Sequence, residues 1–231
     1  MLSVMIAALL VLQQPTAPSS TGPEITALVA PVIDAIAAEQ ARQAALPPAT
    51  TDRERLERMG ELDQVGRRVA ITVDLSHVPE ADRPAADMAL WAPIGAMDDR
   101  LSAELIRMLP AEGWFYKSVY GEDAARTAFL IIQHADATLQ RRFVPVLESL
   151  VASGEVEGSS YGLMYDRLAL SEGRPQRYGT QMTCKNARWV IDYDNLEDPE
   201  HADARRDAIG FMQTLAEYET NFARYPPCKD E

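Results

Sequence analysis

Apolar residues recur at helical spacing along most of this chain, and proline or glycine interrupts each run. The first run repeats Ile25, Val32 and Ile36 and stops at Pro47 and Pro48. Apolar side chains three and four positions apart line one face of an α-helix. Similar runs predict helices at about residues 25–46, 52–70, 85–91, 98–109, 121–150, 159–173 and 201–222. The chain is therefore expected to be mainly α, with about seven helices.

One stretch near the C-terminus favours strands instead. Tyr178–Cys184 and Arg188–Asp192 flank the short polar sequence Lys185-Asn186-Ala187, which is typical of a small β-hairpin. The chain has 231 residues and no strong internal boundary. It also has no phosphate-binding glycine-rich loop and no alternation of strands with helices. We therefore expect a single helical domain over residues 24–231 that includes this hairpin.

The first residues predict export. Residues 1–12 form an apolar run that is too short to span a bilayer as a helix, and polar residues and proline follow it. This pattern is typical of a signal peptide, expected at residues 1–17, with a flexible spacer at residues 18–23. The alternative is an uncleaved apolar anchor helix. Signal removal would leave a periplasmic or secreted protein with no stable membrane insertion.

Two cysteines, Cys184 and Cys228, are compatible with one disulfide in an exported chain. Two free, buried thiols are the alternative. Three histidines and no paired-cysteine motif give a zinc site little material, so we expect no metal and no cofactor. The net charge of -13 argues against a nucleic-acid partner and against anionic lipid, because both require clusters of Lys and Arg.

Polar residues interrupt the apolar face of the expected helix at 129–150. At 100° per residue, Gln133, Asp136 and Gln140 fall in the centre of that face. A buried carboxylate is costly unless it is paired, so Asp136 needs hydrogen bonds or a cation such as Arg67 or Arg167. The polar stripe therefore predicts either a pocket between helices or a hydrogen-bond network that fixes their register.

Several motifs occur in an order that resembles a bacterial family of unknown function, often exported. The resemblance covers about Asp52 to Tyr218 and implies a shared fold and site without implying a reaction. The family usually has Gly-Trp-Pro where this chain has Gly113-Trp114-Phe115, and often Asn in the region of Asp98-Asp99-Arg100. The matching pieces are Asp63-Gln64, Gly113-Trp114, Gln133-His134-Ala135-Asp136 with Gln140, Asp166-Arg167 and Tyr178-Gly179-Thr180-Gln181.

These residues predict a site built from three segments, which are the helix with Asp63–Arg67, the helix with Gln133–Gln140 and the region Asp166–Gln181. Asp136 and His134 are the candidates for proton transfer. The candidates for binding a small polar or anionic substrate are Asp63, Gln64, Arg67, Gln133, Gln140, Asp166, Arg167, Tyr178 and Gln181. Gly158-Ser159-Ser160-Tyr161-Gly162 has the form of a hydrolase nucleophile motif, but no strand precedes it, so a serine there is expected to cap a helix.

The leading hypothesis is thus a metal-independent enzyme, either a hydrolase or a lyase. The alternative is a non-catalytic periplasmic binding or structural protein, in which the same residues form a satisfied network in the core.

Overall fold

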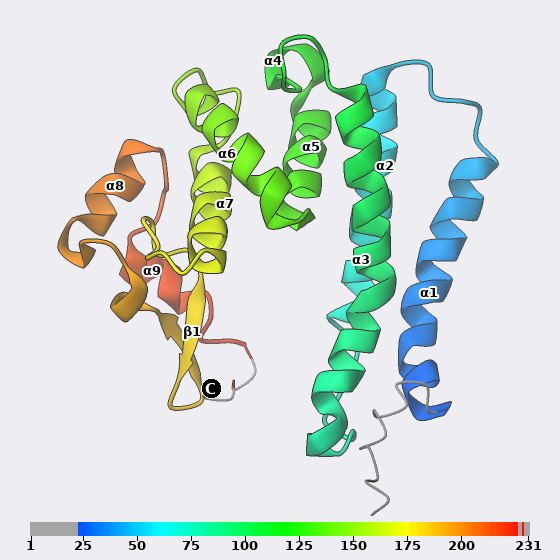
Figure 1. Cartoon of the computed structure of the whole chain (residues 1–231), viewed down its shortest axis with the longest axis horizontal. Helices are drawn as coiled ribbons and strands as arrows, with labels where there is room; N and C mark the ends of the chain where they lie inside the picture. Colours follow the sequence, from blue (N-terminus) through cyan, green and yellow to red (C-terminus); the bar gives the residue numbers. More distant parts are fainter. Residues whose placement is uncertain (1–22, 226–227, 229–231) are drawn as a thin grey trace, which may run out of the picture.

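The computed structural model describes residues 23–225 and Cys228. The expected signal peptide at residues 1–17 and all but the last residue of the expected spacer lie outside this range. Within it, the expected fold class is confirmed: the chain is mainly α, with one two-stranded hairpin near its C-terminus (Figure 1). None of the described helices is long and apolar enough to cross a membrane.

The helices fall into two groups that are joined by α5 (Figure 1). Helices α1, α2 and α3 pack against one another, and α5 packs against α2 and α3. Helix α6 packs against α7, with the hairpin and the short C-terminal helices beyond them. The bounds are α1 Pro23–Ala44, α2 Asp52–Ala70, α3 Arg83–Met108, α4 Lys117–Tyr120, α5 Glu122–His134, α6 Ala137–Val151, α7 Gly158–Ser171, β1 Met182–Lys185, β2 Arg188–Ile191, α8 Ala202–Ala208 and α9 Leu215–Thr220.

One buried apolar cluster joins the two groups of helices. Helices α1, α2, α3, α5, α6 and α7 each contribute a side chain with almost no exposure to it. Representative members are Val32, Leu56, Leu105, Ile132, Leu147 and Met164. A smaller cluster around Ile191 and Leu215 lies beneath the hairpin. Burial of these apolar faces is the main term that holds the helices together.

The prediction of one long helix at 129–150 is wrong. The chain forms α5 and α6, with Ala135 and Asp136 in extended backbone between them. The carboxylate of Asp136 accepts a hydrogen bond of 2.9 Å from the backbone N–H of Leu139, and so caps α6. A short acidic side chain competes well for the unpaired N–H groups that begin a helix. Both halves are amphipathic, which is why their apolar positions read as one continuous pattern.

Two further boundaries differ from expectation. The helices expected at 85–91 and 98–109 are a single helix, α3, which contains Pro93 and buries Leu90, Ile94 and Met97 at helical spacing. The helix expected at 201–222 is divided into α8 and α9. Gly210 lies between them with a φ of +87°, which a residue with a side chain rarely adopts.

The sequence Thr51-Asp52-Arg53-Glu54 has the form of a capping box, in which Thr51 caps α2 and Glu54 reaches back to the Thr51 N–H, and only the first of these contacts forms. Thr51 caps α2 by accepting the N–H of Glu54, but the Glu54 carboxylate accepts the N–H of Thr50 and not that of Thr51. The serine cap expected for α7 is wrong, because the helix already begins at Gly158 with Glu157 at its N-cap. A Cβ at Gly158 would lie 1.5 Å from the Ile209 carbonyl oxygen. This glycine therefore serves close backbone packing and not a nucleophile turn.

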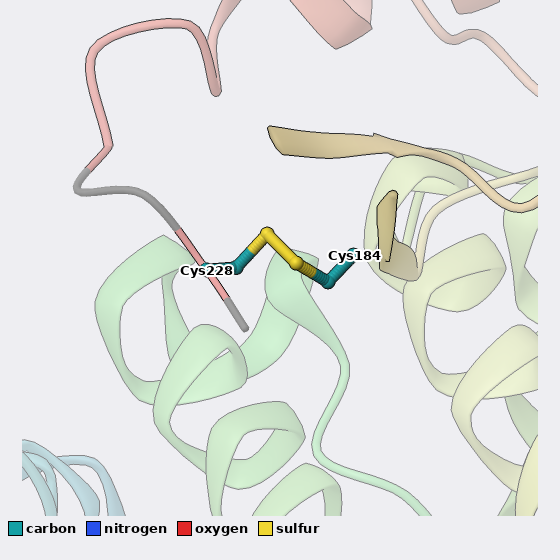
Figure 2. Close-up of a disulfide and its surroundings, with 2 residues drawn as sticks. All are labelled: Cys184 and Cys228. Atoms are coloured by element: carbon teal, nitrogen blue, oxygen red, sulfur yellow. A yellow bond between two sulfur atoms is a disulfide. The ribbon is translucent and has the colours of Figure 1, made fainter. Parts of the chain in front are cut away.

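The expected hairpin forms, but its first strand begins at Met182 and not at Tyr178. Of the two expected states of the cysteines, the disulfide is the one that forms. Strands β1 and β2 are antiparallel, and Asn186 and Ala187 form the turn with positive φ angles of 54° and 59°. A disulfide joins Cys184 on β1 to Cys228 (Figure 2). It ties the end of the chain to the hairpin.

Replacement of Asp136 by alanine should lower the free energy of unfolding by about 1 kcal/mol, because α6 loses its cap. Asp136→Asn should be nearly neutral, since an asparagine oxygen can accept the same N–H of Leu139. Urea unfolding followed by circular dichroism would measure both changes. Equal losses in the two variants would show that the negative charge of Asp136 matters more than the cap.

Reduction of the disulfide should destabilise the chain. The two cysteines are 44 residues apart, and the loss of a cross-link over such a loop costs about 4 kcal/mol in the chain-entropy model. Thermal unfolding with and without dithiothreitol would measure the effect. The Cys184→Ser/Cys228→Ser variant, which should not respond to the reductant, is the control. Identical midpoints for the oxidised and reduced wild-type protein would contradict the prediction.

Candidate functional site

A buried carboxylate on α2 is the centre of the candidate site. Asp63 is only 2% exposed. One of its oxygens lies 2.9 Å from Nδ1 of His134, the last residue of α5. Its other oxygen accepts a hydrogen bond of 2.5 Å from the amide of Gln64. Asp63 is thus paired with an imidazole, which satisfies the requirement that a buried carboxylate have polar partners.

Arg67 lies one turn after Asp63 and between two carboxylates. Its guanidinium is 2.5 Å from Asp98 on α3 and 3.9 Å from Asp63. Burial raises the pKa of Asp98, and the nearby charge of Arg67 opposes that rise. Nε of Arg67 is buried and has no hydrogen-bond partner among the described residues. The site therefore contains an unsatisfied donor, which a bound polar group could pair with.

The side chains joined to Asp63 directly or through Arg67 form one group, called the Asp63 cluster: Asp63, Gln64, Arg67, Asp98 and His134. Asp98 is the member that the sequence analysis did not place in the site. It follows the buried Met97 and lies one turn after the buried Ile94 on α3. The signal for it was a carboxylate at the edge of an apolar helical face, as with Asp63 on α2. Because α3 was expected to be two helices, that face was not recognised as continuous.

Gln140 and Arg167 meet at the end of α5. The amide of Gln140, which is buried on α6, donates hydrogen bonds of 3.0 Å to the carbonyl oxygens of Gln133 and Ala135. Arg167 on α7 donates to the same Gln133 oxygen at 3.3 Å. The last carbonyls of a helix have no partner within it, so both side chains satisfy groups that the break after α5 leaves free.

The positive charge of Arg167 is not balanced by a carboxylate among the described residues. Burial lowers its pKa, and so does the nearby charge of Arg67. Within the described part of the chain no carboxylate lies within ion-pair distance of Arg167. A guanidinium without an acidic partner, on which the charge of a second guanidinium acts, favours a bound anion.

The neighbouring Asp166 belongs to a different cluster. It is completely buried and accepts hydrogen bonds from the backbone N–H groups of Arg177, Tyr178 and Thr180, and from the Thr180 hydroxyl. Burial raises its pKa, and these hydrogen bonds oppose the rise. Adjacent helix residues point in different directions, so Asp166 orders the 176–181 loop while Arg167 faces α5.

Tyr178 and Gln181 take part in the loop that Asp166 orders. Tyr178 is buried, and its ring packs edge-on against Tyr161 and Tyr165. Gln181 donates a hydrogen bond to the hydroxyl of Thr180. Among the described residues, no hydrogen bond joins this loop to the Asp63 cluster. The structure thus brings together two of the three expected segments, plus Arg167.

Asp136 lies elsewhere. The expected burial of its carboxylate is wrong: the residue is exposed and lines a shallow surface pocket with Asp99 and Arg107. Its position at a helix N-cap explains the difference, because the break in the backbone turns Asp136 out of the apolar face on which a continuous helix would have placed it.

Asp63, Asp98 and His134 could also be considered as metal ligands. One ligand atom from each lies within 4.8 Å of the other two, and carboxylate and imidazole groups are common ligands of divalent metals. Arg67 already lies against both carboxylates, and Nδ1 of His134 is bonded to Asp63. A metal ion would have to displace these contacts, so the donor set fits a cation poorly.

The fold and the site define a mainly α-helical protein with a buried Asp–His pair beside two arginines. The chain belongs to the family of unknown function DUF6624, whose model matches residues 51–223. No curated protein and no solved structure matches it. The family match starts at the cap of α2 and includes every residue of the Asp63 cluster.

Asp166→Asn should lower the free energy of unfolding by about 2–4 kcal/mol, because the amide nitrogen cannot accept the hydrogen bonds of one carboxylate oxygen. Asp203→Asn is a matched control. Its carboxylate accepts a single bond, 2.7 Å long, from the N–H of Leu215, and an amide oxygen can keep that bond. Chemical unfolding would compare the two variants. Equal, small losses would show that the loop does not depend on Asp166.

Proposed function

We propose that this protein is a metal-independent hydrolase in which His134 transfers protons and in which Arg67 and Arg167 bind an anionic group of a small substrate. The observation that carries the proposal is the hydrogen bond of 2.9 Å between Nδ1 of His134 and buried Asp63. An imidazole held in this way has one nitrogen fixed and the other available for chemistry.

Asp63 would act as the positioning residue. Its carboxylate accepts the Nδ1 proton, so the neutral imidazole is held in the tautomer that leaves Nε2 as a base. Nε2 has no hydrogen-bond partner among the described residues and is not among the fully buried nitrogens that lack one. It therefore reaches solvent. There it can take a proton from water as that water attacks the substrate, and then return the proton to the leaving group.

The arginines would supply the electrostatic part of catalysis. Arg167 has no acidic partner among the described residues, and Nε of Arg67 is unpaired. Donors fixed in a site from which water is largely excluded stabilise developing negative charge more effectively than the same groups in water. In this proposal His134 replaces Asp136 as the proton-transfer group, because Asp136 is exposed and caps α6.

A second candidate function rests on the ion pairs themselves. Arg67 is bonded to Asp98, and Asp63 is bonded to both His134 and Gln64. A network paired to this degree can also serve only to fix the packing of α2 against α3 and α5. In that case the protein would be a non-catalytic binding or structural protein, and removal of His134 would change stability alone.

The proposed enzyme would act in the periplasm or outside the cell. The support for this location is the disulfide between Cys184 and Cys228, because reducing compartments disfavour structural disulfides. The apolar run at residues 1–12 is the corresponding sequence signal.

The test is a panel of p-nitrophenyl esters, phosphates and glycosides, assayed with the wild-type protein and with His134→Gln. Turnover of at least one compound should fall by about 100-fold or more in the variant, the usual range for loss of a general base. Asp63→Asn should cause a smaller loss in kcat with little change in KM, because the imidazole remains but its tautomer is no longer fixed.

His201→Gln is the control for a chemically similar pair. Nδ1 of His201 also lies 2.9 Å from an aspartate, Asp198, but the imidazole is 69% exposed. This variant should keep full activity. If no compound is turned over and His134→Gln only unfolds at a lower temperature than the wild type, the network is structural and the catalytic proposal fails.

A further inference from the structure

A pocket of about 390 Å³ lies between α5 and α7, on a different side of α5 from Asp63. Its floor is apolar and includes Trp114, Phe129 and Leu163. Trp114 and Phe129 are almost fully buried, so the floor belongs to the core and is fixed in shape. The volume lies within the range of known small-molecule sites, which are typically apolar with a few polar groups.

One end of this pocket lies next to the proposed active site along α5. Gln133, the residue before His134, lines it. On the opposite wall Arg167 follows Leu163 by one helical turn and so continues the same face of α7. Its guanidinium donates to the Gln133 carbonyl at 3.3 Å, which places it next to the Gln133 end of the pocket. Arg67 lies 3.9 Å from Asp63, the partner of His134, and its charge lowers the pKa of Arg167.

The charges along the pocket are unequal. The end remote from Arg167 carries Glu122, Glu155 and Glu157, and one of these, Glu157, is paired with Lys117 at 3.3 Å. The end at Gln133 has no carboxylate in its lining, and Arg167, which lies outside the lining, donates to the Gln133 carbonyl there. Two cations, Lys117 and Arg126, also line the pocket and only partly offset its three carboxylates. A ligand with one anionic group is therefore oriented by this field, with its anion toward Arg167 and away from the acidic end.

We propose that the pocket binds the apolar body of an amphipathic anion, whose carboxylate or other acidic head lies between Arg167 and Arg67 beside His134. The inference rests on the proposed function, since it assigns a substrate class to the same site. The apolar floor provides affinity through burial, and the arginines determine the orientation. Ser160 to Arg167 spans roughly 10 Å of α7, at about 1.5 Å per residue, which matches a bicyclic aromatic body or a medium-length alkyl chain.

The test uses 8-anilinonaphthalene-1-sulfonate, which combines an apolar body with one anionic head and fluoresces when it is buried. It should bind the wild-type protein, and sodium octanoate should displace it at a concentration at least tenfold lower than 1-octanol does. Leu163→Trp fills the pocket and should weaken binding of the dye at least tenfold. Ser160→Trp, on the rim, should do the same and serves if the first variant does not fold.

Arg167→Gln should remove the preference for octanoate over octanol while leaving octanol competition unchanged. The control is Met88→Glu, in the apolar groove between α1 and α3, where Met88 is 72% exposed and is another surface that could bind the dye. That variant should bind the dye as the wild type does. Loss of binding in Met88→Glu but not in Leu163→Trp or Ser160→Trp would overturn the inference.

His134→Gln separates this inference from the proposed function. The variant should bind the dye and octanoate normally, because the apolar floor and Arg167, and not His134, provide their binding contacts. Normal dye binding with unchanged turnover in His134→Gln would reject the catalytic role and keep the pocket. Lost turnover in His134→Gln, with dye binding insensitive to Leu163→Trp and Ser160→Trp, would keep the catalytic role and reject the pocket.

Discussion

The break between α5 and α6 is the constraint on which the candidate site depends. A helix that ends leaves its last carbonyl oxygens without partners, and here the Gln133 oxygen receives hydrogen bonds from Gln140 and Arg167. The capping of α6 by Asp136 fixes where the next helix begins. His134 is consequently the last residue of α5, at the point where that helix meets Asp63 on α2.

Buried charges then fix the positions of α2, α3 and α5 along one another. Asp63 and Arg67 are one turn apart on α2, and their partners come from α5 and α3. In the second half of the chain Asp166 does the same for a loop by accepting several backbone N–H groups. The removal of one member of such a pair leaves the other unsatisfied, which costs far more than the pair contributes as a whole. This asymmetry explains why the network constrains packing whether or not it is catalytic.

The two Asp–His pairs among the described residues show why burial matters for function. Asp198 and His201 are joined at the same distance as Asp63 and His134, but they lie in water at the surface. There the imidazole can rotate and exchange partners freely. At Asp63 the carboxylate is enclosed and Arg67 lies 3.9 Å from it, so the ring is held in one orientation next to positive charge. The environment, and not the pair of residue types, makes His134 the better candidate for chemistry.

The sequence by itself determined the fold class and several local features. Helical periodicity gave the mainly α fold, strand-forming residues around Asn186 gave the hairpin, and a single pair of cysteines left one disulfide to form. Thr51 marked the start of α2, because a cap depends on neighbours three residues away. These features are local or combinatorial, so no knowledge of packing was needed to predict them.

Only the tertiary structure decided which polar residues meet. A period of 3.6 residues continues through Asp136 almost unchanged, so the pattern could not reveal that the backbone turns there. Asp98 lies 31 residues from Arg67 and His134 lies 71 residues from Asp63, so no local rule links the members of either pair. The pairing of buried charges is fixed by how three helices pack, which is a property of the folded chain as a whole.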